Sequence, residues 1–170
     1  MVRFKPKIFG IVIKHNVPKA AKLAIEVSDW LVKKKCKVIV ADEAEGFFAK
    51  RKDAPKLPKE ELPGACHMIL VFGGDGTFLS IARQMIWKSI PILGVNLGTL
   101  GFLTEVKVEE IYETLEGVLK GNYSVQERSM LEACVKRQGK ELFCLPVLND
   151  VVITKSAIAR VIDFQMSVNG

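Results

Sequence analysis

The sequence lacks the long apolar runs and the histidine clusters that mark several large classes of protein. No apolar run approaches the ~20 residues needed to span a bilayer. The basic N-terminus is followed by a short strand-like run without a small-residue cleavage site, so we expect no signal peptide. Two histidines, His15 and His67, offer little for a metal cluster or a catalytic triad. These features favour a cytoplasmic protein with no membrane partner.

The four cysteines show no C-x-x-C spacing, which argues against a zinc site. We expect reduced, mostly buried thiols at Cys36, Cys66, Cys134 and Cys144. The formal net charge of +6 comes from scattered lysines and arginines, without the basic and aromatic interleave of nucleic-acid surfaces. The basic balance is compatible with a polyanionic small molecule such as a nucleotide, and we expect no nucleic-acid partner.

The chain begins with alternating strand-like and helix-like segments. Strands are expected at residues 7–14, 37–41, 66–72 and 91–96, and helices after residue 18, from about 78 to 88 and at 108–121. Residues 42–64 form a polar, proline-bearing connection, with one short helical piece near 43–49. This alternation predicts an α/β fold, a Rossmann-like three-layer domain with a parallel sheet, over residues 1–122.

The chain is organised around a glycine-rich turn at residues 73–77, between a strand and a helix. Three glycines within four residues let backbone N–H groups approach an anionic ligand closely at a helix N-terminus. Asp75 does not fit a site for phosphate alone, because a carboxylate repels phosphate. It makes sense if it accepts a proton or hydrogen bonds from a sugar hydroxyl, or holds a metal ion, beside the phosphates. The alternative is a structural turn with a helix cap.

Two further polar features favour a ligand site over a structural turn. A second strand ends in the glycine-bearing turn 96–103, where Asn96 supplies an amide and Gly98 clears space for the backbone. Phe102 in this turn is either core or a wall against a base. Asn149 and Asp150 interrupt an apolar run, as a β-bulge, as a strand end or as a pair facing a cleft between domains.

From residue 123 the pattern changes to consecutive strands. Strands are expected at residues 124–136, 141–155 and 160–168, with a turn at 137–140. We interpret residues 123–170 as the first strands of an incomplete antiparallel β domain. Three strands alone leave an apolar face uncovered, so we expect a truncated chain that self-associates as a homo-oligomer.

The three motifs in this order resemble those of the NAD kinases, in particular the bacterial and archaeal type. The resemblance covers nearly the whole chain. The first motif alone is not specific, because diacylglycerol kinases, sphingosine kinases and phosphofructokinases carry similar glycine–aspartate turns. The second motif and the Asn-Asp pair are more specific. A further family motif, rich in Thr, Gly, Ser and Tyr, is expected beyond residue 170, so this stretch alone is expected to be inactive.

The resemblance implies ATP-dependent phosphorylation of the adenosine ribose 2′-hydroxyl of NAD, giving NADP, with a divalent ion such as Mg²⁺. Asp75 would be the catalytic base, the glycine turn would shape the phosphate site, and Phe102 would help wall the adenine site. Alternatives are a lipid kinase of the diacylglycerol kinase type and a non-catalytic nucleotide-binding module. The residues expected to bind ATP or NAD are Gly73, Gly74, Asp75, Gly76, Thr77, Phe78, Asn96, Gly98, Phe102, Asn149 and Asp150.

Overall fold

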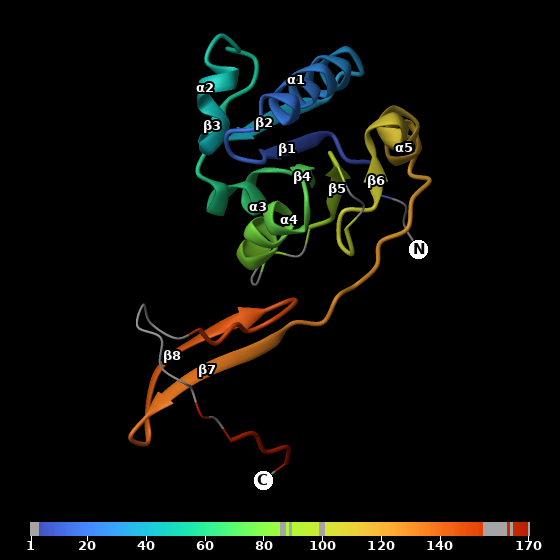
Figure 1. The fold of residues 1–170 in the computed structure, drawn as a ribbon. Coiled ribbons are helices and arrows are strands. Elements are labelled where there is room, and N and C mark those ends of the chain that lie inside the picture. The colour runs from blue at the N-terminus through green and yellow to red at the C-terminus, as the bar shows by residue number, and fades with distance from the viewer. Residues whose placement is uncertain are drawn as a thin grey trace.

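The computed structural model describes residues 4–85, 88, 90–98, 101–154, 163 and 165–169. Within them a six-stranded parallel sheet is followed by an antiparallel hairpin that extends away from it (Figure 1). The strands of the sheet are β1 Ile8–Ile13, β2 Lys37–Ala41, β3 Lys56–Leu57, β4 Met68–Gly73, β5 Ile92–Asn96 and β6 Val106–Lys107. The helices are α1 Pro18–Lys33, α2 Glu45–Phe48, α3 Leu62–Ala65, α4 Asp75–Ala82 and α5 Ile111–Lys120.

Short 3₁₀ turns η1 to η4 complete the α/β part, at Asp42–Ala44, Lys59–Glu61, Arg83–Met85 and Val108–Glu110. The strand order is β3-β2-β1-β4-β5-β6, with every neighbouring pair parallel. This order is typical of dinucleotide-binding Rossmann folds, and it reverses between β1 and β4. The predicted fold class is therefore confirmed.

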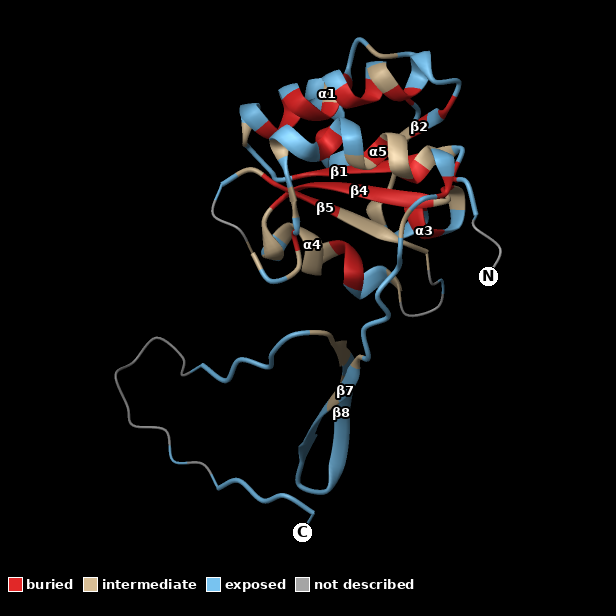
Figure 2. Ribbon diagram, turned by 90° about the vertical axis from the view of Figure 1, so that its right-hand side faces the viewer, coloured by how far each residue is buried: buried red, intermediate tan, exposed pale blue. Residues whose placement is uncertain are grey.

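Alternate residues of the central strands pack on opposite faces of the sheet, which is why these strands are apolar throughout. Leu70 and Phe72 of β4 join the core formed with α1 and α5, whereas Ile69 and Val71 join the core formed with α3 and α4. Figure 2 shows this burial, with α1 and α5 on one side of the sheet and α4 on the other. The result is the expected three-layer arrangement.

Helix α1 illustrates how local sequence sets an element. Pro18 occupies the first helical turn, where its missing N–H costs nothing, and Val17 is the extended residue before it. The helix buries apolar positions at helical spacing, such as Ala24, Val27 and Leu31, against the sheet. It ends at Lys33, two residues before Lys35 adopts a left-handed φ of 61°.

The connection at residues 42–64 is more ordered than the sequence predicts. The short helical piece predicted near 43–49 is present as η1 and α2, but the edge strand β3, which pairs with β2, and helix α3 were not predicted. Phe48, Ala54 and Leu62 are fully buried and anchor the connection to the two cores. Three apolar side chains spaced widely in a polar stretch were too sparse to indicate this packing. The short strand β6 was also missed.

The hairpin consists of β7 Leu131–Arg137 and β8 Lys140–Val147. The predicted turn is confirmed, with Gln138 and Gly139 both at positive φ. β7 begins seven residues later than predicted, and β8 ends eight residues earlier, so Asn149 and Asp150 follow β8 rather than interrupt it. Part of the third predicted strand, 160–168, lies outside the described residues: positions 160–162 and 164. Its described positions, 163 and 165–168, carry no strand.

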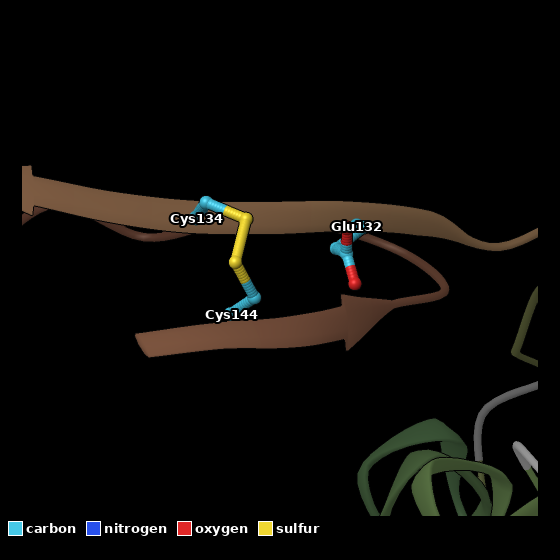
Figure 3. Close-up of side chains that lie close together, drawn as sticks. All are labelled: Glu132, Cys134 and Cys144. Carbon is cyan, nitrogen blue, oxygen red and sulfur yellow. A yellow bond between two sulfur atoms is a disulfide. The ribbon is translucent and has the colours of Figure 1, made fainter. Parts of the chain in front are cut away.

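The thiol prediction is confirmed for two cysteines and wrong for the other two. Cys36 and Cys66 are buried and free, and burial raises the pKa of the Cys66 thiol to about 12. Cys134 and Cys144 form a disulfide across the hairpin, with their Cα atoms 4.1 Å apart (Figure 3). They are directly opposed in the β7–β8 register, a relationship that a search for C-x-x-C spacing does not detect.

Among the described residues, no helix is long and apolar enough to cross a membrane.

Candidate functional site

The site lies where β4 and β5 end at the same edge of the sheet. Gly73, the last residue of β4, is in register with Asn96, the last residue of β5. Because the strands are parallel, the turns that follow them are neighbours. This edge lies beside the point where the strand order reverses, which is where open α/β sheets hold their ligands.

Helix α4 begins directly after the first turn, with Gly74 as its N-cap residue and Asp75 in its first turn. Carbonyl O of Gly74 accepts the N–H groups of Thr77 and Phe78 at 3.0 and 3.1 Å. A Cβ at Gly73 would come within 2.5 Å of Oγ1 of Thr77, so only glycine lets the turn close this tightly. Cβ atoms at Gly74 and Gly76 would meet nothing within 4 Å, which leaves open space at the helix start.

The Asp75 carboxylate accepts hydrogen bonds from three consecutive backbone N–H groups of the second turn. Oδ2 accepts the N–H of Phe102 at 2.8 Å, and Oδ1 accepts the N–H groups of Leu103 and Thr104 at 3.1 and 3.2 Å. The Thr104 hydroxyl is the fourth donor to the carboxylate and the third to Oδ1, at 3.2 Å. Asp75 therefore clamps the second glycine turn onto the start of α4.

These donors lower the pKa of Asp75. Burial alone would raise the pKa of the carboxyl, but the hydrogen bonds from Phe102, Leu103 and Thr104 favour the charged form and hold the pKa below its ordinary value. A carboxylate has about four lone-pair positions, two on each oxygen. Among the described residues, Oδ1 has three donors and is full, whereas Oδ2 has one donor and a lone pair for a ligand.

Glycine at position 101 permits this approach. A Cβ there would lie 2.6 Å from Cγ and 2.8 Å from Oδ2 of Asp75, closer than any side chain tolerates. A residue with a side chain at this position would push the second turn away from α4. The second turn was predicted to clear space for a ligand, and in the structure its backbone surrounds Asp75.

Asn96 is buried, with 6% of its surface exposed, and braces the second turn from within. Its Oδ1 accepts the N–H of Gly98 at 2.8 Å, and its Nδ2 donates to the Thr104 hydroxyl at 3.1 Å. Thr104 was missed by the sequence analysis. A lone threonine after the apolar pair Phe102-Leu103 was the signal that could have identified it.

The remaining predicted residues divide into two groups. Phe78 is half-buried and packs with the core on the α4 side of the sheet, whereas the Phe102 side chain is 91% exposed. Asn149 and Asp150 are exposed after β8, and the hydrogen bond described for them joins Asn149 Nδ2 to Asp150 Oδ1 at 3.2 Å. The described contacts thus bring together the residues of the first two motifs, but not this pair.

A groove of about 770 Å³ lies beside Asp75 rather than over it. Phe78, Gly94 and Leu103 line it from the α/β part, and Leu148, the residue before Asn149, lines it from the end of the hairpin. The end of the hairpin and the second turn therefore line the same groove.

The family model described as ATP-NAD kinase N-terminal domain matches residues 9–123. The chain belongs to the NAD kinase family. It is 45% identical to the NAD kinase of Syntrophotalea carbinolica over 163 residues, which are 96% of this chain and 56% of that protein. It is 42% identical to the NAD kinase of Magnetococcus marinus, over 95% of this chain and 54% of that protein. The chain thus spans about half the length of these NAD kinases.

Solved structures of NAD kinases share the fold. Yeast NADH kinase complexed with NADH has a TM-score of 0.73 at 20% identity, over 86% of this chain and 48% of that chain. An Archaeoglobus fulgidus NAD kinase in complex with ATP has a TM-score of 0.55 at 22% identity, over 79% and 45%. These structures confirm the fold, and the family resemblance is confirmed by the match to the family model. Neither a lipid kinase nor a non-catalytic module gains support from these relatives.

Proposed function

We propose that the full-length protein transfers the terminal phosphoryl group of ATP to the 2′-hydroxyl of the adenosine ribose of NAD, giving NADP and ADP. The observation that carries this proposal is Oδ2 of Asp75, which has a single donor among the described residues and lies at the start of α4 beside open glycine backbone. A ribose hydroxyl that donates to Oδ2 would be oriented for attack on the phosphorus. The match to the NAD kinase family supports NAD as the molecule that carries this ribose.

In this reaction the ribose oxygen forms a bond to phosphorus while the bond to the ADP oxygen breaks. Asp75 accepts the proton of the hydroxyl and later gives it to solvent. The lowered pKa of Asp75 is compatible with this role, because phosphoryl transfer passes through a loose transition state in which the nucleophile needs orientation more than a strong base. The first task of Asp75 is thus to point the hydroxyl at the phosphorus.

The glycine turn would shape the phosphate site. A Cβ at Gly74, Gly76 or Gly98 would meet nothing within 4 Å, so phosphate oxygens could approach the backbone there. We propose that Gly73 and Thr77 hold this turn closed and that Asn96 keeps the second turn in place. The exposed Phe102 ring is accessible as a wall for the adenine, and Asn149 and Asp150 are accessible to the adenosine part.

The described residues do not make a Mg²⁺ site by themselves. Among them, the one group of three potential ligands is Glu132, Cys134 and Cys144, far along the chain in the hairpin, and its two sulfur atoms are bonded to each other (Figure 3). With its donors among the described residues, Asp75 has one lone-pair position left, on Oδ2. We propose that Mg²⁺ arrives bound to the phosphates of ATP, as part of the substrate, and we assign it no step.

We also propose that residues 1–122 and 123–170 belong to different domains. Helix α5 ends at Lys120 with Gly121 in the left-handed conformation, and the family match ends at residue 123. Limited proteolysis of the full-length protein should cut first in the exposed segment 124–129. Cleavage within 42–64 instead would contradict this division.

We propose that the full-length protein is a homo-oligomer. Alternate residues of the hairpin place Leu131, Val135, Phe143 and Leu145 on one face, and each is 42–76% exposed. Such a contiguous apolar face requires a cover. Light scattering of the full-length protein would give its mass, and a monomer at all concentrations would contradict the proposal.

The deciding experiment is NADP formation from NAD and ATP by the full-length protein, beside the 170-residue chain and a diacylglycerol acceptor. We expect NADP from the full-length protein, no product from the lipid and no turnover by the shorter chain. A folded full-length protein that binds NAD without forming NADP would overturn the proposed function.

A further inference from the structure

The hydroxyl of Thr104 lies between the two glycine turns and is fully buried. It donates to Oδ1 of Asp75 at 3.2 Å and accepts from Nδ2 of Asn96 at 3.1 Å. Asp75 belongs to α4 and Asn96 ends β5, so one side chain links the two elements that form the site.

The groups at the two ends of this series, the Asn96 amide and the Asp75 carboxylate, determine which group donates in each hydrogen bond. Oδ1 of Asn96 accepts the N–H of Gly98, and this contact orients the amide so that Nδ2 faces Thr104. Because an amide nitrogen only donates, the Thr104 oxygen must accept there, and its single hydrogen is left for Asp75. The series of donors therefore ends on the carboxylate.

The methyl group of Thr104 is packed as tightly as its hydroxyl. A Cβ at Gly94 would lie 2.9 Å from both Cα and Cγ2 of Thr104. Glycine at position 94 thus lets Thr104 lie directly against β5. This packing leaves the side chain little freedom to rotate its hydroxyl away from Asp75.

The Thr104 hydroxyl completes the set of three donors on Oδ1. With Oδ1 occupied, the carboxylate cannot turn to offer it to a ligand, and Oδ2 is the oxygen that remains accessible. Within the described part of the chain, burial raises the pKa of Asp75 and the neutral donors of Phe102, Leu103 and Thr104 lower it, and no charged side chain is among the causes.

We propose that Thr104 is a positioning residue for the phosphoryl transfer, which fixes the Asp75 carboxylate so that Oδ2 receives the substrate hydroxyl. This inference rests on the proposed function, and it concerns a residue that does not itself contact the substrate. A positioning role requires a hydroxyl at position 104, whereas a purely structural role would require only a side chain of the same shape.

The test compares Thr104→Val, which keeps the shape, with Thr104→Ser, which keeps the hydroxyl, in the full-length protein. We expect Thr104→Val to lower kcat by about 10- to 100-fold, as for the loss of a hydrogen bond to a charged group, with a smaller change in the KM for NAD. Thr104→Ser should stay within about threefold of the wild type in kcat. The matched control is Thr114→Val, because the Thr114 hydroxyl donates to the Glu110 carbonyl within α5.

A second readout does not depend on activity. The carboxyl pKa of Asp75, followed by ¹³C NMR of the full-length protein, should rise in Thr104→Val and stay unchanged in Thr114→Val. If Thr104→Val does not fold, Thr104→Ala replaces it in both measurements, because it leaves room for a water beside Asn96.

The two proposals fail separately. If the wild-type full-length protein makes no NADP, the proposed function is wrong and the Asp75 pKa still decides the role of Thr104. An unchanged Asp75 pKa in Thr104→Val would overturn the inference. So would a wild-type kcat in Thr104→Val, or a loss in Thr104→Ser as large as that in Thr104→Val.

Discussion

The Asp75 carboxylate and the backbone N–H of Phe102 are joined at 2.8 Å, although 27 residues separate them in the chain. This bond and its neighbours make the carboxylate both the proposed catalytic group and the connection between the two glycine turns. Substitutions at Asp75 should therefore affect turnover and the stability of the second turn together.

Replacing Asp75 with asparagine should remove most activity from the full-length protein. An amide side chain at this position cannot take a proton from the ribose hydroxyl, so we expect kcat to fall by about 10²- to 10⁴-fold. Circular dichroism should show an intact fold. Asp29→Asn is the matched control, since Asp29 lies near the end of α1 and its carboxylate pairs with Arg51 at 2.6 Å. Full turnover by Asp75→Asn would exclude Asp75 as the base.

Replacing Gly101 with alanine should displace the second turn from α4. The added Cβ would lie 2.6 Å from Cγ of Asp75, and relieving that overlap should cost about 1–3 kcal/mol of the free energy of unfolding. Chemical denaturation gives this value. Gly98→Ala is the control for stability, because its Cβ would meet nothing within 4 Å. Equal stability of the two variants would show that the turn yields without cost.

The stability conferred by Asp75 should depend on pH in a defined direction. Its pKa in the folded chain lies below the ordinary value, because the N–H groups of Phe102, Leu103 and Thr104 outweigh the effect of burial. The ionised group therefore stabilises the fold above the unfolded-state pKa, and this contribution is lost as the pH falls through the folded-state pKa.

Thermal unfolding of the wild type and Asp75→Asn between neutral pH and about pH 3 would measure this effect. The difference in stability should be constant near neutrality and should shrink at the acidic end. A difference that does not change with pH would show that the carboxylate gains nothing from its four donors.

Reducing the Cys134–Cys144 disulfide should loosen the hairpin and leave the parallel sheet intact. The bond closes a loop with a sequence separation of 10. Loop closure of this size is worth about 3 kcal/mol, and a two-stranded hairpin is marginal without such support. Hydrogen exchange should show faster exchange of the amides in β7 and β8 after reduction. Cys36 and Cys66 are already free, so the reductant has no other target among the described cysteines.

Much of the α/β part could be predicted from local patterns. The strand β2 has the predicted bounds, β4 and β5 agree to within a residue or two, and Pro18 starts α1 as expected. These segments are fully apolar or strictly periodic, and such patterns leave few alternatives. The connection at 42–64 was misjudged because its order comes from isolated side chains, such as Phe48 and Leu62, that bury themselves in distant cores.

The sequence by itself determined that a carboxylate would lie at the start of a helix among glycines. The reason is the residue order, in which an apolar strand is followed by the glycine-rich turn at 73–77 and then by a helical pattern. Only the tertiary structure decided what surrounds that carboxylate. The parallel pairing of β4 with β5 brings Phe102, Leu103 and Thr104 against Asp75, and their donors lower its pKa and leave one oxygen open. Hydrogen bonds between residues so far apart depend on strand register, and register follows from packing that no local pattern contains.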